Sequence, residues 1–252
     1  MTFLKQECPS YQLTTFFLSQ SKRKYMAFIY FPLVFLSLFL HPSLGQSQSV
    51  EVIEHWYHEV TGDKHEHFLW SMTPGSTTVR ISSKKGHEET SLVCLPTGEV
   101  THWQQKDANG TFLTAIRSGE SLSITGKRDG NEILKRFELD EKPWYQFLSF
   151  SLRSFLADKN AQTITFWMLR PDTLEPFLLE ASKVGSETIK YLRKPLSAIK
   201  IKVAPHGFMG KFWHVHYWYR LPDFLFVMYR GTHGGPLTPE TIITLDDEYR
   251  KL

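Results

Sequence analysis

From about residue 50 onwards, apolar and polar residues alternate in short runs that are rich in β-branched and aromatic side chains. Turn-forming residues separate these runs at spacings of about 8 to 12 residues, which is typical of an antiparallel all-β domain. So many strands exceed what one flat sheet holds, so we expect the sheet to curl or close. The runs predict fifteen strands, at residues 51–60, 65–72, 77–83, 88–95, 99–106, 111–117, 120–126, 132–139, 162–170, 174–183, 186–193, 197–204, 210–220, 223–230 and 239–246.

Short turn sequences join several of these predicted strands. Thr61–Lys64 contains Gly-Asp, Asp107–Gly110 contains Asn-Gly, and Arg128–Gly130 contains Asp-Gly. Glycine, asparagine and aspartate tolerate the positive φ angles that tight hairpin turns require. These three segments therefore predict hairpins between consecutive strands.

Residues 143–157 break the alternation and predict one helix. Pro143 is tolerated in a first helical turn, and the acidic residues Glu138, Asp140 and Glu141 precede it, where negative charge favours a helix N-terminus. We expect this helix to lie against the concave face of the sheet. Its apolar residues recur at intervals of three and four and form one face: Trp144, Phe147, Leu148, Leu152, Phe155 and Leu156.

The first 45 residues have the layout of a signal peptide. An uncharged apolar run, residues 26–40, directly follows the basic residues 22–24, and the small residues Ser43 and Gly45 precede a candidate cleavage point after Gly45. Fifteen apolar residues are fewer than the roughly 20 that span a bilayer, so a retained membrane anchor is the alternative. The predicted organisation is a leader, 1–45, and a single β domain, 46–252, exported to a periplasm or secreted.

Composition narrows the class of protein. The 252 residues are 41% apolar and 22% charged, which excludes collagen-like, coiled-coil and disordered chains. The leader holds four of the 29 basic residues and one of the 26 acidic ones, so 25 of each remain in the body. A neutral body lacks the basic surface that nucleic-acid binding needs.

Only two cysteines are present, and one of them, Cys8, lies in the predicted leader. Cleavage would leave Cys94 alone, so the mature protein would have no internal disulfide and its stability would come from its core. Cys94 falls within the alternating apolar stretch 91–95. We interpret it as a small buried apolar residue rather than a reactive thiol.

Two histidine pairs are candidate metal ligands. His65 and His67 flank Glu66, and His214 and His216 flank Val215, so alternation along a strand places each pair on one face. If the two strands were neighbours, the four imidazoles could bind zinc, with Glu66 as a general base for hydrolysis. Packed or solvent-exposed histidines without a metal are the alternative interpretation.

The segment 212–219 is the richest in aromatic residues, and both of its faces carry aromatic rings. Such a strand is either central and covered on both sides or forms the wall of a ligand cavity. No lysine or hydroxyl follows the glycine-rich segment 231–236 at the spacing of a phosphate-binding loop, so this segment predicts a turn. We predict no catalytic residue and no cofactor. The candidate cavity residues are Trp213, Tyr217, Trp218, Trp144 and Trp167.

Aromatic patterns in 143–152, 166–171, 212–220 and 229–236 resemble a group of uncharacterised bacterial secreted β proteins, which are similar in outline to the half-barrel fold of periplasmic lipoprotein carriers. The resemblance implies fold and compartment, and no site residues. Together with the strand pattern it gives a mainly β protein, an antiparallel meander curled into a half-barrel or open barrel with one helix against it. An outer-membrane barrel is disfavoured because the predicted strands carry charges on both faces.

The expected function follows from the fold. The main hypothesis is an exported, non-catalytic protein that binds an apolar or lipid-like molecule in the cell envelope and contacts a membrane only through its leader. One alternative is the zinc-dependent hydrolase. The other is a structural or interaction protein of the envelope that binds no small ligand.

Overall fold

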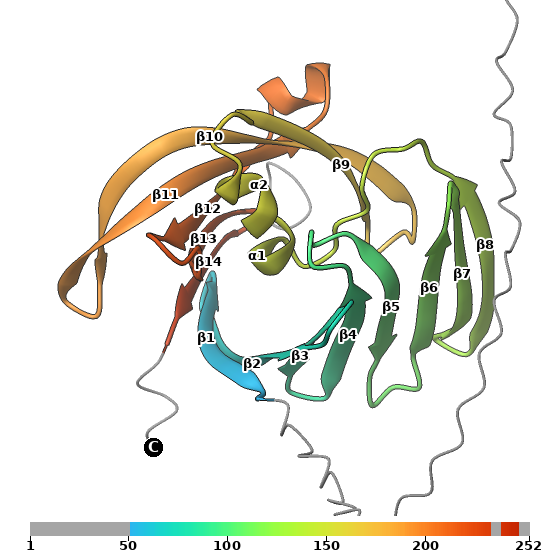
Figure 1. The fold of residues 1–252 in the computed structure, drawn as a ribbon. Coiled ribbons are helices and arrows are strands. Elements are labelled where there is room, and N and C mark those ends of the chain that lie inside the picture. Colours follow the sequence, from blue (N-terminus) through green and yellow to red (C-terminus); the bar gives the residue numbers. More distant parts are fainter. Residues whose placement is uncertain (1–50, 233–237, 247–252) are drawn as a thin grey trace, which may run out of the picture. The chain divides into compact units, whose positions relative to one another are not determined.

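The computed structural model describes residues 51–232 and 238–246, and these form one sheet of fourteen antiparallel strands (Figure 1). The order of the strands is β8-β7-β6-β5-β4-β3-β2-β1-β14-β13-β12-β11-β10-β9, so two meanders are joined where β1 pairs with β14. The predicted fold class is confirmed. The strands are β1 (Ile53–Thr61), β2 (Lys64–Pro74), β3 (Val79–Lys85), β4 (Glu88–Cys94), β5 (Val100–Lys106), β6 (Phe112–Ser118), β7 (Ser121–Arg128), β8 (Asn131–Glu138), β9 (Thr163–Leu169), β10 (Pro176–Tyr191), β11 (Lys194–Pro205), β12 (Val215–Arg220), β13 (Phe226–Thr232) and β14 (Glu240–Leu245).

These residues belong to a compact unit that runs from Gln48 to Leu252. The predicted leader, 1–45, lies outside the described residues, so its cleavage stays a prediction. Most of the predicted turn 231–236 also lies outside them, since the description resumes at Thr238 after Thr232.

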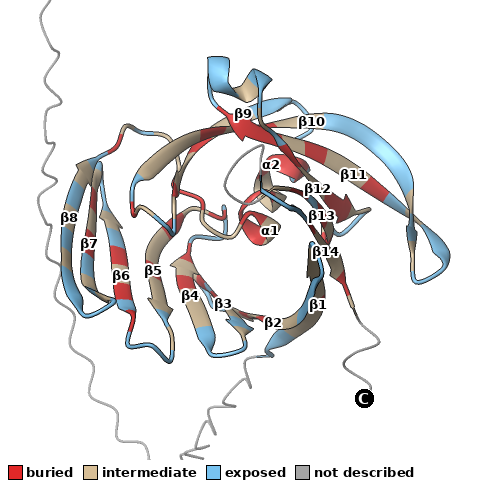
Figure 2. Cartoon of the chain, turned by 180° about the vertical axis from the view of Figure 1, so that it is seen from behind, coloured by how far each residue is buried: buried red, intermediate tan, exposed pale blue. Residues whose placement is uncertain are grey.

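The sheet curls around two short helices, α1 (Leu148–Ser151) and α2 (Arg153–Ala157), which Figure 1 shows inside the curve. Alternation along each strand places every second side chain on the same face of the sheet. Ile81, Leu92 and Trp103 lie side by side on β3, β4 and β5, and each is almost inaccessible to solvent. Figure 2 shows the buried segments along the sheet and on both helices, so the core lies within the curve.

The predicted helix at 143–157 is wrong in its first five residues. Residues 143–147 are extended, because their backbone pairs with strands on either side. Val100 of β5 donates its N–H to the Trp144 carbonyl at 2.8 Å, and the Tyr145 N–H donates to the Trp167 carbonyl of β9 at 2.8 Å. The segment therefore bridges β5, an inner strand of the first meander, and β9, the end strand of the second.

The acidic cluster before this segment does not cap a helix, since no acidic residue lies in the first turn of α1. Asp140 instead forms an ion pair with Lys142 and accepts a 2.7 Å hydrogen bond from the Trp167 indole. The hydrogen bond from Lys142, followed by that from Trp167, lowers the pKa of Asp140 to about 2. Asp140 thus fixes the bridging segment to β9.

Two strand predictions needed revision. The runs 174–183 and 186–193 are one strand, β10, with an irregularity in register between Lys183 and Gly185 rather than a break. Gly185 has a φ of 146°, a backbone conformation that residues with a Cβ rarely adopt. The predicted strand 210–220 begins only at Val215, after the 3₁₀ turn η1 (Phe208–Lys211).

The predicted hairpin turns are confirmed. Asp129 and Gly130 have φ angles of 51° and 81° and connect β7 to β8. Between β5 and β6, the Asp107 carboxylate accepts hydrogen bonds from the N–H groups of Asn109 and Thr111 at 2.8 and 3.0 Å. Side-chain acceptors of this kind replace backbone partners in tight turns.

Cys94 is buried, as predicted. Its side chain is fully inaccessible, and burial raises the pKa of the thiol to about 12. A thiol in this environment stays protonated and behaves as an apolar residue.

Candidate functional site

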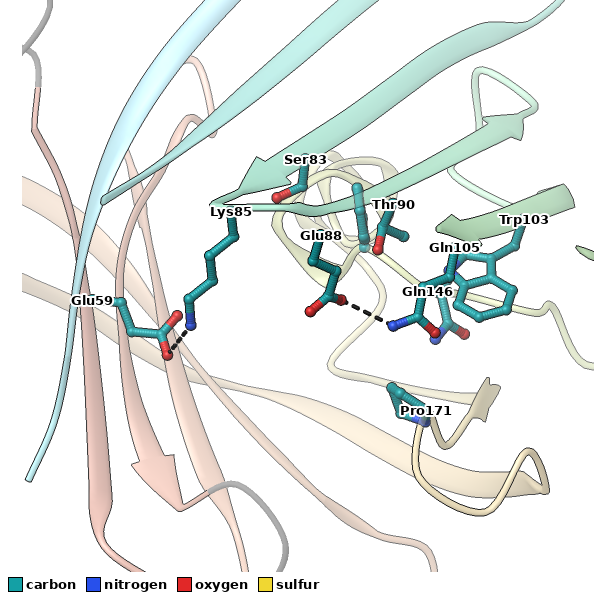
Figure 3. A pocket seen from close by; sticks show the side chains of 10 residues that line it. Glu59, Ser83, Lys85, Glu88, Thr90, Trp103, Gln105, Gln146 and Pro171 are labelled. Carbon is teal, nitrogen blue, oxygen red and sulfur yellow. Dashed lines mark hydrogen bonds and ion pairs between the residues drawn. The ribbon is translucent and has the colours of Figure 1, made fainter. Parts of the chain in front are cut away.

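A pocket of about 340 Å³ opens on the concave side of the sheet (Figure 3). Strands β3, β4 and β5 supply its wall, because Ser83, Thr90 and Gln105 are directly paired across them and point to the same face. The bridging segment and the turn after β9 close the other side. The lining residues are Glu59, Ser83, Lys85, Glu88, Thr90, Trp103, Gln105, Gln146, Phe147 and Pro171.

Lys85 is the central charge of this pocket. Its Nζ lies 2.9 Å from Glu59 Oε1 and 2.7 Å from Glu66 Oε2. Burial acts to lower the pKa of Lys85, but the hydrogen bonds to Glu66 and Glu59 outweigh burial, so the pKa is raised. The hydrogen bond from Lys85 lowers the pKa of Glu66. Lys85 is therefore charged and held between two carboxylates.

Gln105 contributes an unused hydrogen-bond acceptor. Its Nε2 donates to Glu88 Oε1 at 3.0 Å, an interaction that Figure 3 shows, whereas its buried Oε1 has no partner among the described residues. A buried acceptor without a donor is costly, typically about 1–3 kcal/mol. A molecule in the pocket that offers a hydroxyl or N–H group would satisfy it.

Gln146 belongs to the pocket wall but serves the fold. Its Oε1 accepts hydrogen bonds from the Trp144 indole at 3.1 Å and the Leu169 N–H at 3.0 Å, and its Nε2 donates to the Leu169 carbonyl at 2.8 Å. The side chain thus completes the pairing of β9 near its end. Phe147, the next residue, provides apolar surface to the pocket.

The structure does not bring the five predicted cavity residues together. Trp144 is fully buried in the core, and Trp167 is bound to Asp140 at the bridging segment. Tyr217 and Trp218 point to opposite faces of β12. Tyr217 packs 5.0 Å from the ring of Tyr229 inside the curve.

The remaining two predicted cavity residues are also engaged. The Trp218 indole donates to Glu187, and Lys200 lies 5.0 Å from its ring centroid. The Trp213 indole donates to Thr232 Oγ1 at 2.9 Å. None of the five lines the pocket described above. The residues that do line it are mostly polar strand residues, which carry no distinctive signal in the sequence.

The four-histidine zinc site is wrong in its geometry. Each pair does share a face, but β2 and β12 are separated by β1, β14 and β13. Four steps of about 4.8 Å place the two pairs roughly 19 Å apart along the sheet, too far for a common ion. Glu66 faces Lys85 inside the curve, whereas His65 and His67 alternate to the outside. Glu66 therefore cannot act as a base beside those imidazoles.

Sequence reasoning missed the partner of His65 and His67. His58 of β1 lies between them, with ring centroids 5.4 Å from His65 and 4.7 Å from His67. The two-residue turn at Gly62 and Asp63 pairs His58 with His67. The register of that hairpin could therefore have predicted this neighbour from the sequence. Burial, followed by the charges of His67 and His65, lowers the pKa of His58. Within 51–232 and 238–246, no group of three or more potential ligands is arranged to hold a metal ion.

None of the helices within the described ranges is long and apolar enough to cross a membrane. No protein-family model matches the chain, and no curated protein matches its sequence. The fold has a solved bacterial counterpart. It is a beta-barrel-like protein of a domain of unknown function, DUF1849, from Brucella abortus, with a TM-score of 0.50 and 5% sequence identity.

That match covers 77% of this chain and 97% of the counterpart. At 5% identity it shows the fold alone. The predicted resemblance to bacterial β proteins is supported to this extent: the counterpart is barrel-like, bacterial and of unknown function. Export and ligand binding stay predictions.

Proposed function

We propose that this chain is an exported, non-catalytic binding protein that holds a small amphipathic, lipid-like molecule in the pocket of its curled sheet. The observation that carries the proposal is Gln105 Oε1, a buried acceptor without a partner among the described residues, in a pocket that also offers apolar surface. A volume of about 340 Å³ lies at the lower end of the range for small-molecule sites, about 300–1,000 Å³.

The chemistry of the lining indicates a ligand with two parts. Phe147 and Pro171 offer apolar contact, whereas Ser83, Thr90 and Gln105 offer polar groups on the opposite wall. The carboxylates of Glu59 and Glu66 more than offset the charge of Lys85, so this wall favours neutral polar groups over an anion. An apolar chain that carries a hydroxyl or amide group fits both walls.

The test is native mass spectrometry of the full chain purified from the cell envelope, compared with the denatured chain. We expect an excess of several hundred daltons that organic solvent removes. Thr90→Phe, which fills the pocket, should abolish this excess. Ser91→Phe is the matched control, because Ser91 is the next residue of β4 and points to the convex face.

An unliganded wild-type protein would overturn the proposal and leave the structural role in the envelope as the remaining hypothesis. Equal loss of the excess mass in both variants would mean that the substitutions disturb β4 rather than the pocket. Denaturant unfolding of each variant separates these cases, since a variant in which β4 is disturbed should unfold at a lower midpoint than the wild type.

A further inference from the structure

Arg153 is a partly buried, charged residue inside the curl of the sheet. It lies at the start of α2, and its guanidinium carbon is 5.9 Å from the Trp70 ring centroid and 5.6 Å from that of Phe150. None of the ion pairs among the described residues includes Arg153. Its Nε is buried and has no hydrogen-bond partner there.

The surroundings of Arg153 make this costly. Arg153 is partly buried. A cation that has lost part of its hydration is normally paired and hydrogen-bonded, because two aromatic faces recover only part of that loss. Asp223 is the acid whose charge acts on Arg153, and it already binds Arg220, which donates to it through Nε at 3.0 Å and through a second contact from the same guanidinium. The pKa of Arg153 is lowered by burial, as expected for a cation in an apolar setting.

A second unpaired donor lies beside it. Trp70 is 4% exposed, and its indole N–H has no acceptor among the described residues. Trp70 is the cross-strand partner of Ser83, which lines the pocket. Trp70, Ser83, Thr90 and Gln105 form one row of cross-strand neighbours on the concave face. Trp70, at one end, has a donor and Gln105, at the other, an acceptor without a partner in the part of the chain that the structure describes.

We propose that Arg153 and the Trp70 indole form an anion-binding subsite that receives the acidic group of the ligand, a carboxylate or phosphate. This inference rests on the proposed function and adds the ligand's charge to it. A guanidinium and an indole N–H both donate to oxygen anions, and a carboxylate would supply the counter-ion and the acceptor that both groups lack. The apolar part of the ligand would then run along Ser83 towards Phe147.

The test compares decanoate with decanol, which share an alkyl chain and differ in the acidic group, as additives to the full chain in thermal unfolding. We expect decanoate to raise the Tm and to bind about tenfold more tightly than decanol, in line with a charge-assisted hydrogen bond. Arg153→Met should abolish the difference between the two additives. Arg153→Lys should keep part of it.

Arg153→Met has a second readout that a purely structural arginine would not give. Because the variant removes a partly buried charge that has no ion-pair partner among the described residues, and retains an apolar stem, the protein without additive should be at least as stable as the wild type. A large loss of stability would show that Arg153 already has its partner within the fold, and would overturn the proposal. Arg136→Met is the control, since its side chain is 71% exposed beside Glu138 and should change neither measurement.

The two proposals fail in different ways. If decanol and decanoate bind equally and Thr90→Phe abolishes both, the pocket binds a ligand and the anion subsite is refuted. If acetate binds as tightly as decanoate and Arg153→Met abolishes both, the anion subsite exists and the apolar pocket is refuted. No Tm change with any of these additives would overturn the subsite.

Discussion

Gly98 lies against Ser151, and the contact fixes α1 to the turn between β4 and β5. A Cβ added to Gly98 would be 2.6 Å from the Ser151 Cα, and the Ser151 hydroxyl donates a 2.8 Å hydrogen bond to the Gly98 carbonyl. The helix can reach the sheet only because residue 98 has no side chain. This approach sets the position of the bridging segment and, through Phe147, of the pocket wall.

Gly98→Ala should therefore destabilise the protein by about 2–4 kcal/mol, because the substitution combines a backbone clash with strain at a φ of 88°. Gly110→Ala is the matched control. Gly110 has a φ of 85° but nothing within 4 Å of the added Cβ. Backbone strain alone should therefore lower the free energy of unfolding, by about 1 kcal/mol. Urea unfolding measures both, and equal losses would contradict the proposed clash.

Lys85→Met should cost about 1–3 kcal/mol of unfolding free energy, because it leaves the Glu59 side chain, which is only 14% exposed, without its ammonium partner. Lys106→Met is the control. Lys106 and Glu89 are 57% and 39% exposed, so the loss should stay below about 0.5 kcal/mol. Similar losses in the two variants would show that Glu59 is solvated rather than dependent on Lys85.

The same ion pairs predict that the stability of the folded protein depends on pH. The pKa of Glu66 is lowered in the folded protein, so its contribution is complete above the unfolded pKa of about 4.3 and disappears as pH falls through the lower folded value. The stability difference between wild type and Lys85→Met should thus narrow below about pH 4. A gap that stays constant down to pH 2.5 would contradict the role of Glu66.

The stability contributed by His216 should also decrease as pH falls, but here the folded protein favours the neutral form instead of the charged one. Burial, followed by the charge of Lys200, lowers its pKa to about 4, so the folded protein favours the neutral ring. Stability from His216 is complete above the unfolded pKa of about 6.5 and declines as pH falls towards 4. Between pH 7 and 4.5 the wild type should lose about 1 kcal/mol more than His216→Gln, allowing for solvent screening. His87→Gln, on an exposed turn, is the control, and NMR titration should give a His216 midpoint well below 6.

Tyr219 links the sheet to the helix. Its buried hydroxyl donates a 2.7 Å hydrogen bond to the Leu148 carbonyl, so Tyr219→Phe should cost about 1 kcal/mol while retaining the ring. Amide hydrogen exchange in α1 should become faster, corresponding to a decrease of similar size in the free energy of opening. Faster exchange spread evenly over the whole sheet would indicate a global effect instead of a local one.

The sequence by itself determined the strands, their faces and several turns, because alternation and turn chemistry are local properties. Asp129 and Gly130, for example, adopt the positive φ angles of a tight turn whatever the position of their hairpin in the fold. The two-residue turn at Gly62 and Asp63 also fixes a register, and applying it would have placed His58 opposite His67. The burial of Cys94 followed from the same alternation.

Only the tertiary structure decided which distant segments meet. The pairing of Tyr57 with Leu245 joins the two meanders, and it depends on how the whole sheet curls. Residues 143–147 have a helical pattern but are extended, since pairing with Val100 and Trp167 satisfies their backbone groups. Gln105 Oε1 and Arg153 Nε have no partner within 51–232 and 238–246 for a similar reason, since whether a polar atom finds a partner depends on neighbours far along the chain.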